Sequence, residues 1–358
     1  MAFPVSSAAD AVGMFFWSLV TFPIKFSRTT PYLAGVAVCA LALILSGCVQ
    51  MSLDDLGEAS PEISSALLSE MREKGMSPDA PVLVRIFKME SELEIWKLDS
   101  SGKYALLKIF PMCRWSGKLG PKTKEGDRQA PEGFYAVSAG MLNPKSQFYL
   151  SFNLGYPNRL ESALGYTGEA LMVHGACSSS GCFALTDQGV GEIYAIVSRA
   201  LKAGQGAFQV QAYPFRMTPE NLAAHRSDPN MTFWKNLKEG FDIFEVKRQP
   251  PKVSACSRRY VFDADFGGQR TNPLAECPRN FDVADPVIVA RQASDDKKIA
   301  DLIHDATASR LVAYQDGGMH RSYRALLKQN GAQKLAEKIS GINYPVSRPD
   351  AALSDPYR

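Results

Sequence analysis

Alternating apolar and polar positions predict a β-rich core in the first two thirds of the chain. Three strand-like runs follow one another closely, and a Ser-Gly turn separates the second from the third: 82–88, 93–98 and 104–110. Shorter apolar runs predict further strands at 133–139, 147–153, 171–173 and 207–213. Mostly β structure with a few helices predicts a mainly β, α+β fold, built as a β-sandwich or barrel-like sheet.

Helical spacing is found later in the chain. Thr186-Asp187 is typical of a helix start, and the apolar residues that follow recur at helical intervals as far as Leu201. A second pattern covers 219–245 and predicts a helix that packs on the sheet through one apolar face: Phe233, Trp234, Leu237, Phe241 and Phe244. Polar segments beyond 285 predict surface helices, and 344–356 predicts a disordered tail.

The N-terminus carries the pattern of an export signal. Lys25 and Arg28 precede an uncharged apolar run, 32–45, which ends in Leu-Ser-Gly-Cys48. That ending resembles a bacterial lipobox, in which Cys48 is lipidated and becomes the first mature residue; a start at Met14 would explain the long lead. The alternative is an uncleaved anchor helix, although the run is short for a membrane span. Both interpretations place the bulk of the protein outside the cytoplasm and tethered to a membrane.

The bulk composition excludes some classes of function. The 358 residues carry a net charge of +3, which gives no case for nucleic-acid binding. The sequence has no paired Cys-x-x-Cys of a zinc site and no glycine-rich phosphate loop, so we expect no metal and no cofactor. His225, His304 and His320 lie among polar residues and are expected at the surface.

The most specific chemistry lies in residues 173–184. His174 precedes Cys182 by eight residues, and Cys182 ends a Ser-x-Gly-Cys turn. A thiol at neutral pH is mostly protonated and needs a base, a nearby positive charge or a helix start to become a thiolate. A strand delivers His174 at its end, and a helix begins after Cys182, which favours the thiolate. The alternative is a buried structural cysteine beside a core histidine.

The other cysteines have less specific surroundings. Cys39 lies in the apolar run, and Cys113 has no assigned role. Cys256 and Cys277 flank a polar segment, and an oxidising compartment would allow them to pair, which the sequence leaves open. Cys177 is a rival nucleophile, but it lacks the Ser-x-Gly turn and the following helix.

Taken together, these motifs resemble the catalytic domain of the L,D-transpeptidases (YkuD type), and within it the YafK-like branch. The pattern is His174-Gly175 followed by Ser179-Ser180-Gly181-Cys182, and the resemblance covers 82–220 and more loosely extends to about 262. Further matching segments are 120–122, 125–127, 130–135, 151–153, 155–158 and 214–218. Most family members carry a histidine where this chain has Ser180, so His174 is the single base. The short spacing from His-Gly to the cysteine fits the YafK-like branch.

The resemblance implies cysteine-dependent acyl transfer on peptidoglycan stem peptides. His174 would take the proton of Cys182, and a backbone carbonyl near Gly175 would orient the imidazole. The N–H groups of Gly181 and Cys182 are candidate oxyanion donors, and Ser179 shapes the turn. The thiolate would attack the carbonyl at the L-centre of diaminopimelate, D-Ala would leave, and an amine would accept the acyl group.

Two alternatives to a transpeptidase remain. With water as acceptor, the same site would be a hydrolase that cuts diaminopimelate-linked amides, such as the tether of a peptidoglycan-linked lipoprotein. The other alternative is a non-catalytic lipoprotein that binds the cell wall. For substrate contacts, Lys122 is a candidate partner of a carboxylate, and Trp115, Tyr135 and Tyr156 are candidates for lining the cleft.

The expected organisation has five parts, with the catalytic residues in the third. These are a lipoprotein signal or anchor (1–48), a linker (49–80), an L,D-transpeptidase-like β-sandwich catalytic domain (81–220), an extension packed on it (221–284) and a polar, helical and partly disordered C-terminal region (285–358). The expected partners are stem peptides and a membrane reached through the N-terminus.

Overall fold

The computed structural model describes residues 61–278, 285–305 and 315–354. The predicted export signal and the lipid site Cys48 lie outside the described residues, as does the linker up to residue 60. The chain divides into two units, 1–50 and 51–358, and everything described belongs to the second. No described helix is both long and apolar enough to cross a membrane.

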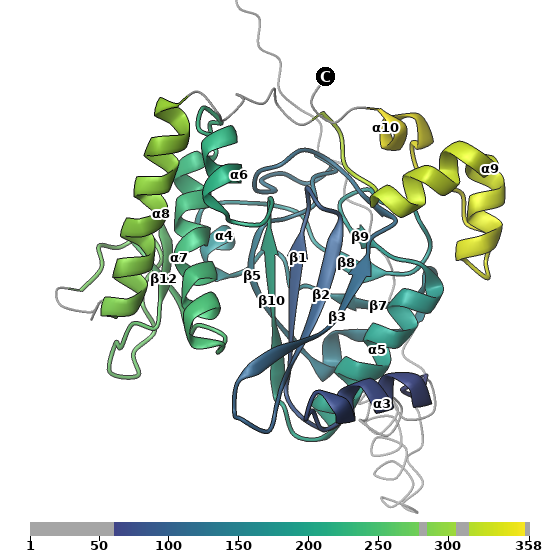
Figure 1. Ribbon diagram of the computed structural model, residues 1–358, viewed down its shortest axis with the longest axis horizontal. Coiled ribbons are helices and arrows are strands. Elements are labelled where there is room, and N and C mark those ends of the chain that lie inside the picture. The colour runs from purple at the N-terminus through teal and green to yellow at the C-terminus, as the bar shows by residue number, and fades with distance from the viewer. Residues whose placement is uncertain (1–60, 279–284, 306–314, 355–358) are drawn as a thin grey trace, which may run out of the picture. The chain divides into compact units, whose positions relative to one another are not determined.

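The first of two five-stranded sheets contains the early strands that the alternation predicts. Its strands lie in the order β3 (Tyr104–Pro111), β2 (Glu92–Leu98), β1 (Val82–Phe87), β10 (Ala207–Tyr213) and β5 (Gly133–Ser138). Neighbouring strands are antiparallel except β1 and β10, which are parallel (Figure 1). Every residue of β1 is buried, because this central strand is covered on both faces.

The second sheet carries the candidate chemistry and consists of shorter strands. Its order is β4 (Arg114–Trp115), β9 (Phe183–Ala184), β8 (Met172–His174), β7 (Tyr149–Asn153) and β6 (Leu142–Ser146). The sequence predicted β7 and β8 but missed β4, β6 and β9. Two-residue strands such as β4 and β9 are too short to show an alternating pattern, and only their pairing with neighbours defines them.

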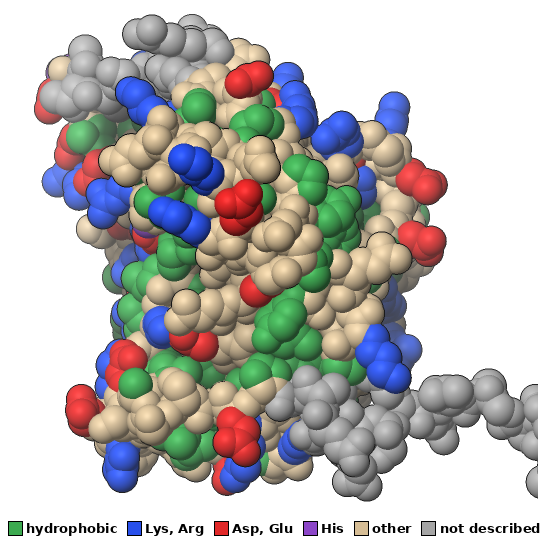
Figure 2. Space-filling view, turned by 90° about the vertical axis from the view of Figure 1, so that its right-hand side faces the viewer, with side chains coloured by type: hydrophobic (Ala, Val, Ile, Leu, Met, Phe, Trp, Pro, Cys, Tyr) green, Lys and Arg blue, Asp and Glu red, His purple; other side chains and the backbone are tan. Residues whose placement is uncertain are grey.

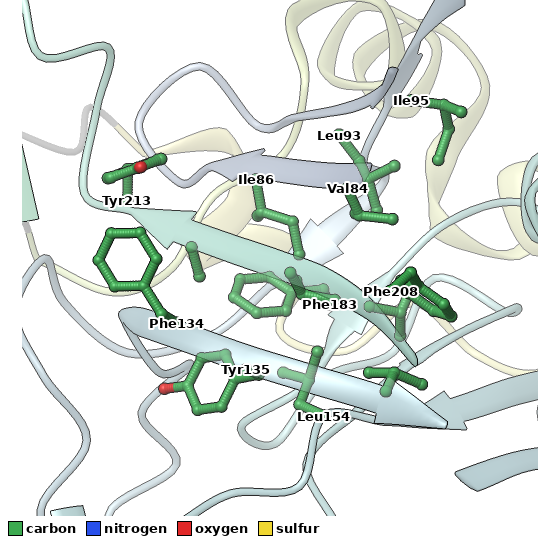
Figure 3. Packing of buried hydrophobic residues seen from close by; sticks show 14 of the residues in the cluster. Val84, Ile86, Leu93, Ile95, Phe134, Tyr135, Leu154, Phe183, Phe208 and Tyr213 are labelled. Atoms are coloured by element: carbon green, nitrogen blue, oxygen red, sulfur yellow. The ribbon is translucent and has the colours of Figure 1, made fainter. Parts of the chain in front are cut away.

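The main hydrophobic core includes one face of each sheet. Figure 3 shows Val84 and Ile86 of β1 and Phe208 of β10 packed near Phe183, which follows Cys182 in the chain. Phe183 is fully buried. Because successive side chains of a strand point to opposite faces, burying Phe183 in the core directs Cys182 and Ala184 to the other face of the second sheet.

Helix α5 (Asp187–Lys202) begins as the sequence predicts. Its N-cap is Thr186, whose side chain accepts from the N–H of Gly189. The one helix predicted over 219–245 is instead two helices, α6 (Pro219–Ala224) and α7 (Met231–Lys247), because the chain turns at the Asp-Pro-Asn segment, 228–230. Helix α7 packs on the first sheet as predicted, with the ring of Phe241 edge-on to that of Tyr213 at 5.4 Å.

Short elements and two longer helices complete the fold. Before the C-terminal region these are α3 (Ser65–Glu73), a 3-10 turn η1 (Ala139–Met141), α4 (Arg159–Ala163), β11 (Val253–Cys256) and β12 (Arg259–Phe262). The predicted surface helices are α8 (Pro286–His304) and α9 (Arg321–Ile339), followed by α10 (Pro349–Leu353). On the face shown in Figure 2, basic and acidic side chains are interspersed.

Two expectations about polar segments are wrong. His225 is buried rather than at the surface, and its ring stacks on Phe215 at 4.5 Å, because the α6–α7 turn folds it beneath α7. The predicted tail is structured as far as residue 354: it contains α10, and Val346 and Ala352 are buried in a second hydrophobic cluster. A few apolar residues are enough to order this segment because they pack on a surface that other parts of the chain provide.

Candidate active site

The pairing of β8 with its neighbours places His174 and Cys182 on one face of the second sheet. Val173 lies opposite Phe183, and His174 lies opposite Ala184. Continuing this register by one residue puts Met172 beside Cys182, and the Met172 N–H donates to the Cys182 Sγ at 3.5 Å. His174 and Cys182 are therefore diagonal neighbours on adjacent strands, a separation that their side chains can bridge.

His174 is oriented by the backbone carbonyl that the family resemblance implies. Its Nδ1 lies 2.5 Å from the carbonyl oxygen of Gly175. A carbonyl can only accept, so Nδ1 carries the proton and Nε2 keeps its lone pair. Nε2 has no hydrogen-bond partner in the described structure, and the side chain packs against the ring of Phe148 at 4.7 Å.

Gly175 must be a glycine for this arrangement to form. A Cβ at this position would lie 2.6 Å from Oδ1 of Asp187 and 2.7 Å from the carbonyl oxygen of Phe148. The close approach of these groups brings the Gly175 carbonyl under the imidazole. The sequence motif His-Gly therefore has a steric cause, which is the space that the neighbouring backbone leaves.

The thiol of Cys182 lies between two backbone groups. The Met172 N–H donates to Sγ, and Sγ lies 3.9 Å from the carbonyl oxygen of Ala170. Cys182 is partly exposed, and it is the free cysteine of the described residues. The imidazole of His174 and this thiol do not share a hydrogen bond in the structure; such bonds often tighten only when substrate is bound.

Burial keeps both reactive groups neutral. It lowers the pKa of His174 from 6.5 to about 4, against the hydrogen bond to Gly175, which raises it. Burial also raises the pKa of the Cys182 thiol, while the Met172 N–H and the charge of Lys122 lower it. The resting pair is therefore a neutral thiol and a neutral imidazole whose free nitrogen can accept a proton.

Ser179 holds the turn that precedes Cys182. Its Oγ donates to the carbonyl oxygen of Cys182 at 2.7 Å and accepts from the Gly181 N–H at 3.3 Å. The same Oγ lies 3.0 Å from the Oγ of Ser116, which joins the turn to the loop that precedes β5. The Gly181 N–H, a predicted oxyanion donor, is thus engaged by Ser179 in this structure.

A groove of about 470 Å³ opens beside the thiol. Ala170 and Met172, which contact the Cys182 Sγ, form part of its wall, and Tyr156 and Glu169 line it as well. The hydroxyl of Tyr156 donates to the carbonyl oxygen of Lys122 at 3.1 Å. Of the predicted cleft aromatics, Tyr156 thus lies in the wall of this groove, and its role in substrate binding stays a prediction.

The other predicted substrate contacts have structural roles here. Trp115 is fully buried, so its assignment to the cleft is wrong: its register with Phe183 puts it on the core face of the sheet. Tyr135 lines a separate pocket and donates to Glu161 at 2.7 Å. Lys122 is buried near the thiol, but its ammonium already pairs with Asp127 at 2.5 Å.

Four further cysteines form two disulfides. Cys113 is joined to Cys177, with Cα atoms 5.3 Å apart, so the rival nucleophile Cys177 has no free thiol. Cys256 is joined to Cys277, the pairing that the sequence leaves open. Disulfides persist in oxidising compartments, in agreement with a location outside the cytoplasm.

Sequence analysis missed two residues that shape the site, Asp187 and Ser347. Asp187 Oδ1 accepts from the Ala176 N–H at 3.0 Å, and Ser347 Oγ accepts from the Ser179 N–H at 2.9 Å. Asp187 carried a signal as the first residue of a predicted helix, but Ser347 carried none, since it lies 168 residues from its partner.

Comparison with known proteins identifies the family. Over 233 residues the sequence is 40% identical to the Escherichia coli K12 protein named "Putative L,D-transpeptidase YafK", covering 65% of this chain and 92% of that protein. The chain belongs to the L,D-transpeptidase family, in its YafK branch. The protein of the same name in E. coli O157:H7 matches to the same extent, and no family model matches. Membership of this cell-envelope family confirms the resemblance drawn from the His-Gly and Ser-x-Gly-Cys motifs.

Solved structures show a weaker likeness. The helical cell shape determining protein Pgp2 of Campylobacter jejuni is 20% identical, with a TM-score of 0.32 over 57% of this chain and 81% of that chain. Bd1075 of Bdellovibrio bacteriovorus is 15% identical, with a TM-score of 0.27 over 37% of this chain and 48% of that chain.

Proposed function

We propose that this protein is a cysteine acyltransferase of peptidoglycan stem peptides, with Cys182 as nucleophile and His174 as base. The observation that carries the proposal is the pair itself. A free thiol lies on the same sheet face as an imidazole whose Nδ1 is held by a carbonyl and whose Nε2 has its lone pair free. A wall-binding module without chemistry has no need for this arrangement.

The reaction follows from these positions. Nε2 of His174 takes the thiol proton as Sγ of Cys182 attacks the peptide carbonyl carbon, which forms the S–C bond. The imidazolium returns the proton to the departing amine as the C–N bond breaks, leaving a thioester on Cys182. An amine or water then attacks the thioester carbon, with His174 again as base, and the C–S bond breaks as the imidazolium returns the proton to Sγ of Cys182. The Cys182 amide is the candidate oxyanion donor, because Ser179 engages that of Gly181.

The groove beside the thiol fits an ammonium-bearing peptide. Glu169 lines it with an exposed carboxylate that forms no ion pair among the described residues. The diaminopimelate of a stem peptide carries a free ammonium group at the far end of its side chain, on the acyl side of the carbonyl that is attacked. We propose that Glu169 pairs with this ammonium, while the buried ammonium of Lys122 remains paired with Asp127.

Purified muropeptides test this function directly. Wild-type protein, Cys182→Ala, His174→Ala and the control Ser180→Ala, an exposed residue of the same turn, are incubated with muropeptides and analysed by mass spectrometry. We expect Cys182→Ala to be inactive and His174→Ala to be slower by at least about a hundredfold. Ser180→Ala should retain wild-type activity.

The products identify the acceptor. Cross-linked or exchanged peptides show a transferase, and hydrolysed amides show the hydrolase alternative. If wild-type protein gives no product and no acyl adduct on Cys182, the catalytic proposal is wrong and the protein is a binding module.

We also propose that the protein is a periplasm-facing lipoprotein held to a membrane through Cys48. Acyl chains add about 0.8 kcal/mol per buried CH₂, so several of them anchor a protein stably. Intact mass measurement of the envelope fraction should give a chain that starts at an acylated Cys48, and Cys48→Ser should remain uncleaved or soluble. A wild-type chain that retains residues 1–47 would show the anchor helix instead.

A further inference from the structure

The sheet face that carries His174 is covered by the C-terminal region of the chain. Arg114, Ala184 and His174 lie side by side on that face, and all three are buried although they point away from the main core. A second hydrophobic cluster packs over Ala184 and the Cys113–Cys177 disulfide, with C-terminal members Met319, Leu327, Leu335, Ile339, Val346 and Ala352. The helices that contribute to it, α9 and α10, are labelled in Figure 1.

Backbone pairing fixes the start of this region at the edge of the second sheet. Gly318 forms a bridge with Trp115 of β4, with N···O distances of 3.0 and 3.1 Å. The His320 N–H donates to the carbonyl oxygen of Met112 at 2.9 Å. The segment therefore continues the sheet past β4, and the chain then passes through α9 and returns to the site.

Where the chain returns, Ser347 bonds to the site through all of its polar groups. Its N–H donates to the carbonyl oxygen of Cys177 at 3.2 Å, and its carbonyl oxygen accepts from Nε of Arg114 at 2.9 Å. Its Oγ accepts from the Ser179 N–H at 2.9 Å and lies 3.4 Å from the Ser179 carbonyl oxygen. Ser179 in turn bonds the Cys182 carbonyl, so Ser347 is one residue removed from the nucleophile.

The same segment also reaches the histidine side of the site. The Gly341 N–H donates to Oδ2 of Asp187 at 2.7 Å, while Oδ1 of that carboxylate holds the Ala176 N–H. Ala176 has a φ of 55°, a left-handed conformation that a residue with a side chain adopts only when its surroundings hold it. The ring of Tyr344 packs edge-on against Phe148 at 4.8 Å, and Phe148 covers His174.

We propose that residues 340–348, here called the C-terminal strap, hold the loop of residues 175–182 in its reactive conformation, with Ser347 as the positioning residue. The strap fixes the loop at both ends, near His174 through Asp187 and near Cys182 through Ser347 and Ser179. This assigns a role within the proposed acyl-transfer site and rests on that proposed function. Ser347 does not line the groove, so its loss should change the rate of the chemical step rather than substrate binding.

Three variants of the full chain test the strap. Ser347→Ala removes the acceptor of the Ser179 N–H, and Ser347→Thr keeps a hydroxyl at that position. The matched control is Ser354→Ala, whose hydroxyl donates to the carbonyl oxygen of Ala351, away from the loop of residues 175–182. For each we measure kcat and KM on muropeptides, thermal unfolding, and the rate of Cys182 alkylation by iodoacetamide against pH.

We expect Ser347→Ala to lower kcat about tenfold with an unchanged KM, the scale of one lost hydrogen bond. We expect at least a threefold change in the alkylation rate, because the thiol leaves its position beside the Met172 N–H. Ser347→Thr should restore both, and Ser354→Ala should match wild type. Wild-type kcat and alkylation in Ser347→Ala, or failure of threonine to restore them, would overturn the proposal.

Two further outcomes are decisive. If Ser347→Ala loses stability, the rates are compared at 10 °C after circular dichroism shows that both proteins are folded. Recovery of the wild-type rate there would show a purely structural role and overturn the proposal. If wild-type protein turns over no muropeptide, the proposed function fails, and the alkylation rates alone decide whether the strap positions the thiol.

Discussion

Lowering the pH should protonate His174, the candidate base, and the pKa of its imidazole determines at which pH this happens. Burial lowers the pKa of His174 from 6.5 to about 4. The imidazole acts as a base only when it is neutral, so activity is present above this pKa and is lost as the pH falls through it. About a tenth of the molecules would carry a protonated His174 at pH 5, and about half at pH 4. An ordinary histidine would be mostly protonated at both pH values.

The same burial links pH to folding. The lowered pKa corresponds to about 3 kcal/mol in favour of the neutral imidazole in the folded state. Because the unfolded chain binds this proton more tightly, His174 reduces the free energy of unfolding as the pH falls from 6.5 towards 4. Above pH 6.5 its contribution is constant.

The assay measures kcat/KM on muropeptides, or acylation of Cys182 by a carbapenem, between pH 3.5 and 8. Circular dichroism at each pH confirms that the protein is folded. The matched control is His225→Gln, because burial lowers the pKa of that histidine too, and it lies outside the groove. An acid limb near pH 6.5, or a limb that moves in His225→Gln, would refute the assignment of His174 as a base buried in its neutral form.

Three further predictions concern groups around the site. Glu132→Gln should lower the free energy of unfolding by about 3–5 kcal/mol in urea titrations, because it leaves the buried ammonium of Lys88, 2.8 Å from this carboxylate, without its counter-charge. As a control, Glu239→Gln removes a partly exposed carboxylate and should change the free energy of unfolding by less than about 1 kcal/mol. Glu169→Gln should raise the KM for diaminopimelate peptides about tenfold with little change in kcat, and an unchanged KM would remove Glu169 from the site. Cys256→Ser should cost about 2–4 kcal/mol of stability and leave kcat unaltered, and a loss of kcat in folded protein would contradict a purely structural disulfide.

The strands could be predicted from the sequence where the residues that alternate as apolar are also the residues that the folded protein buries. Strands β1, β2 and β3 are long enough to show their period, and the start of α5 carries its own N-cap, Thr186. The single helix predicted over 219–245 is interrupted at Asp228-Pro229-Asn230, and the apolar face on which the prediction rested lies wholly in α7, after this turn. The prediction that His225 lies at the surface was also wrong. Its neighbours in sequence are polar, but they do not determine which residues pack on its ring in the folded protein.

The sequence by itself was enough to single out the candidate pair, His174 and Cys182, and the immediate neighbours of each. His174 with Gly175, and Ser179 with Cys182, are bonded within a few residues of one another, so spacing and residue type are sufficient to predict them. The comparisons show the same family that these motifs predict, at 40% identity over 233 residues.

Only the tertiary structure decided what surrounds that pair. The disulfide between Cys177 and Cys113 joins residues that are 64 positions apart in the sequence. The hydrogen bond from the Ser179 N–H to Ser347 joins residues that are 168 positions apart. Contacts at such separations depend on how the whole chain packs, and a short polar segment near the C-terminus carries no local signal of the surface it will cover. For the same reason the burial that keeps His174 neutral could not be inferred from its neighbours in sequence, because the ring packs against Phe148, on which Tyr344 packs in turn.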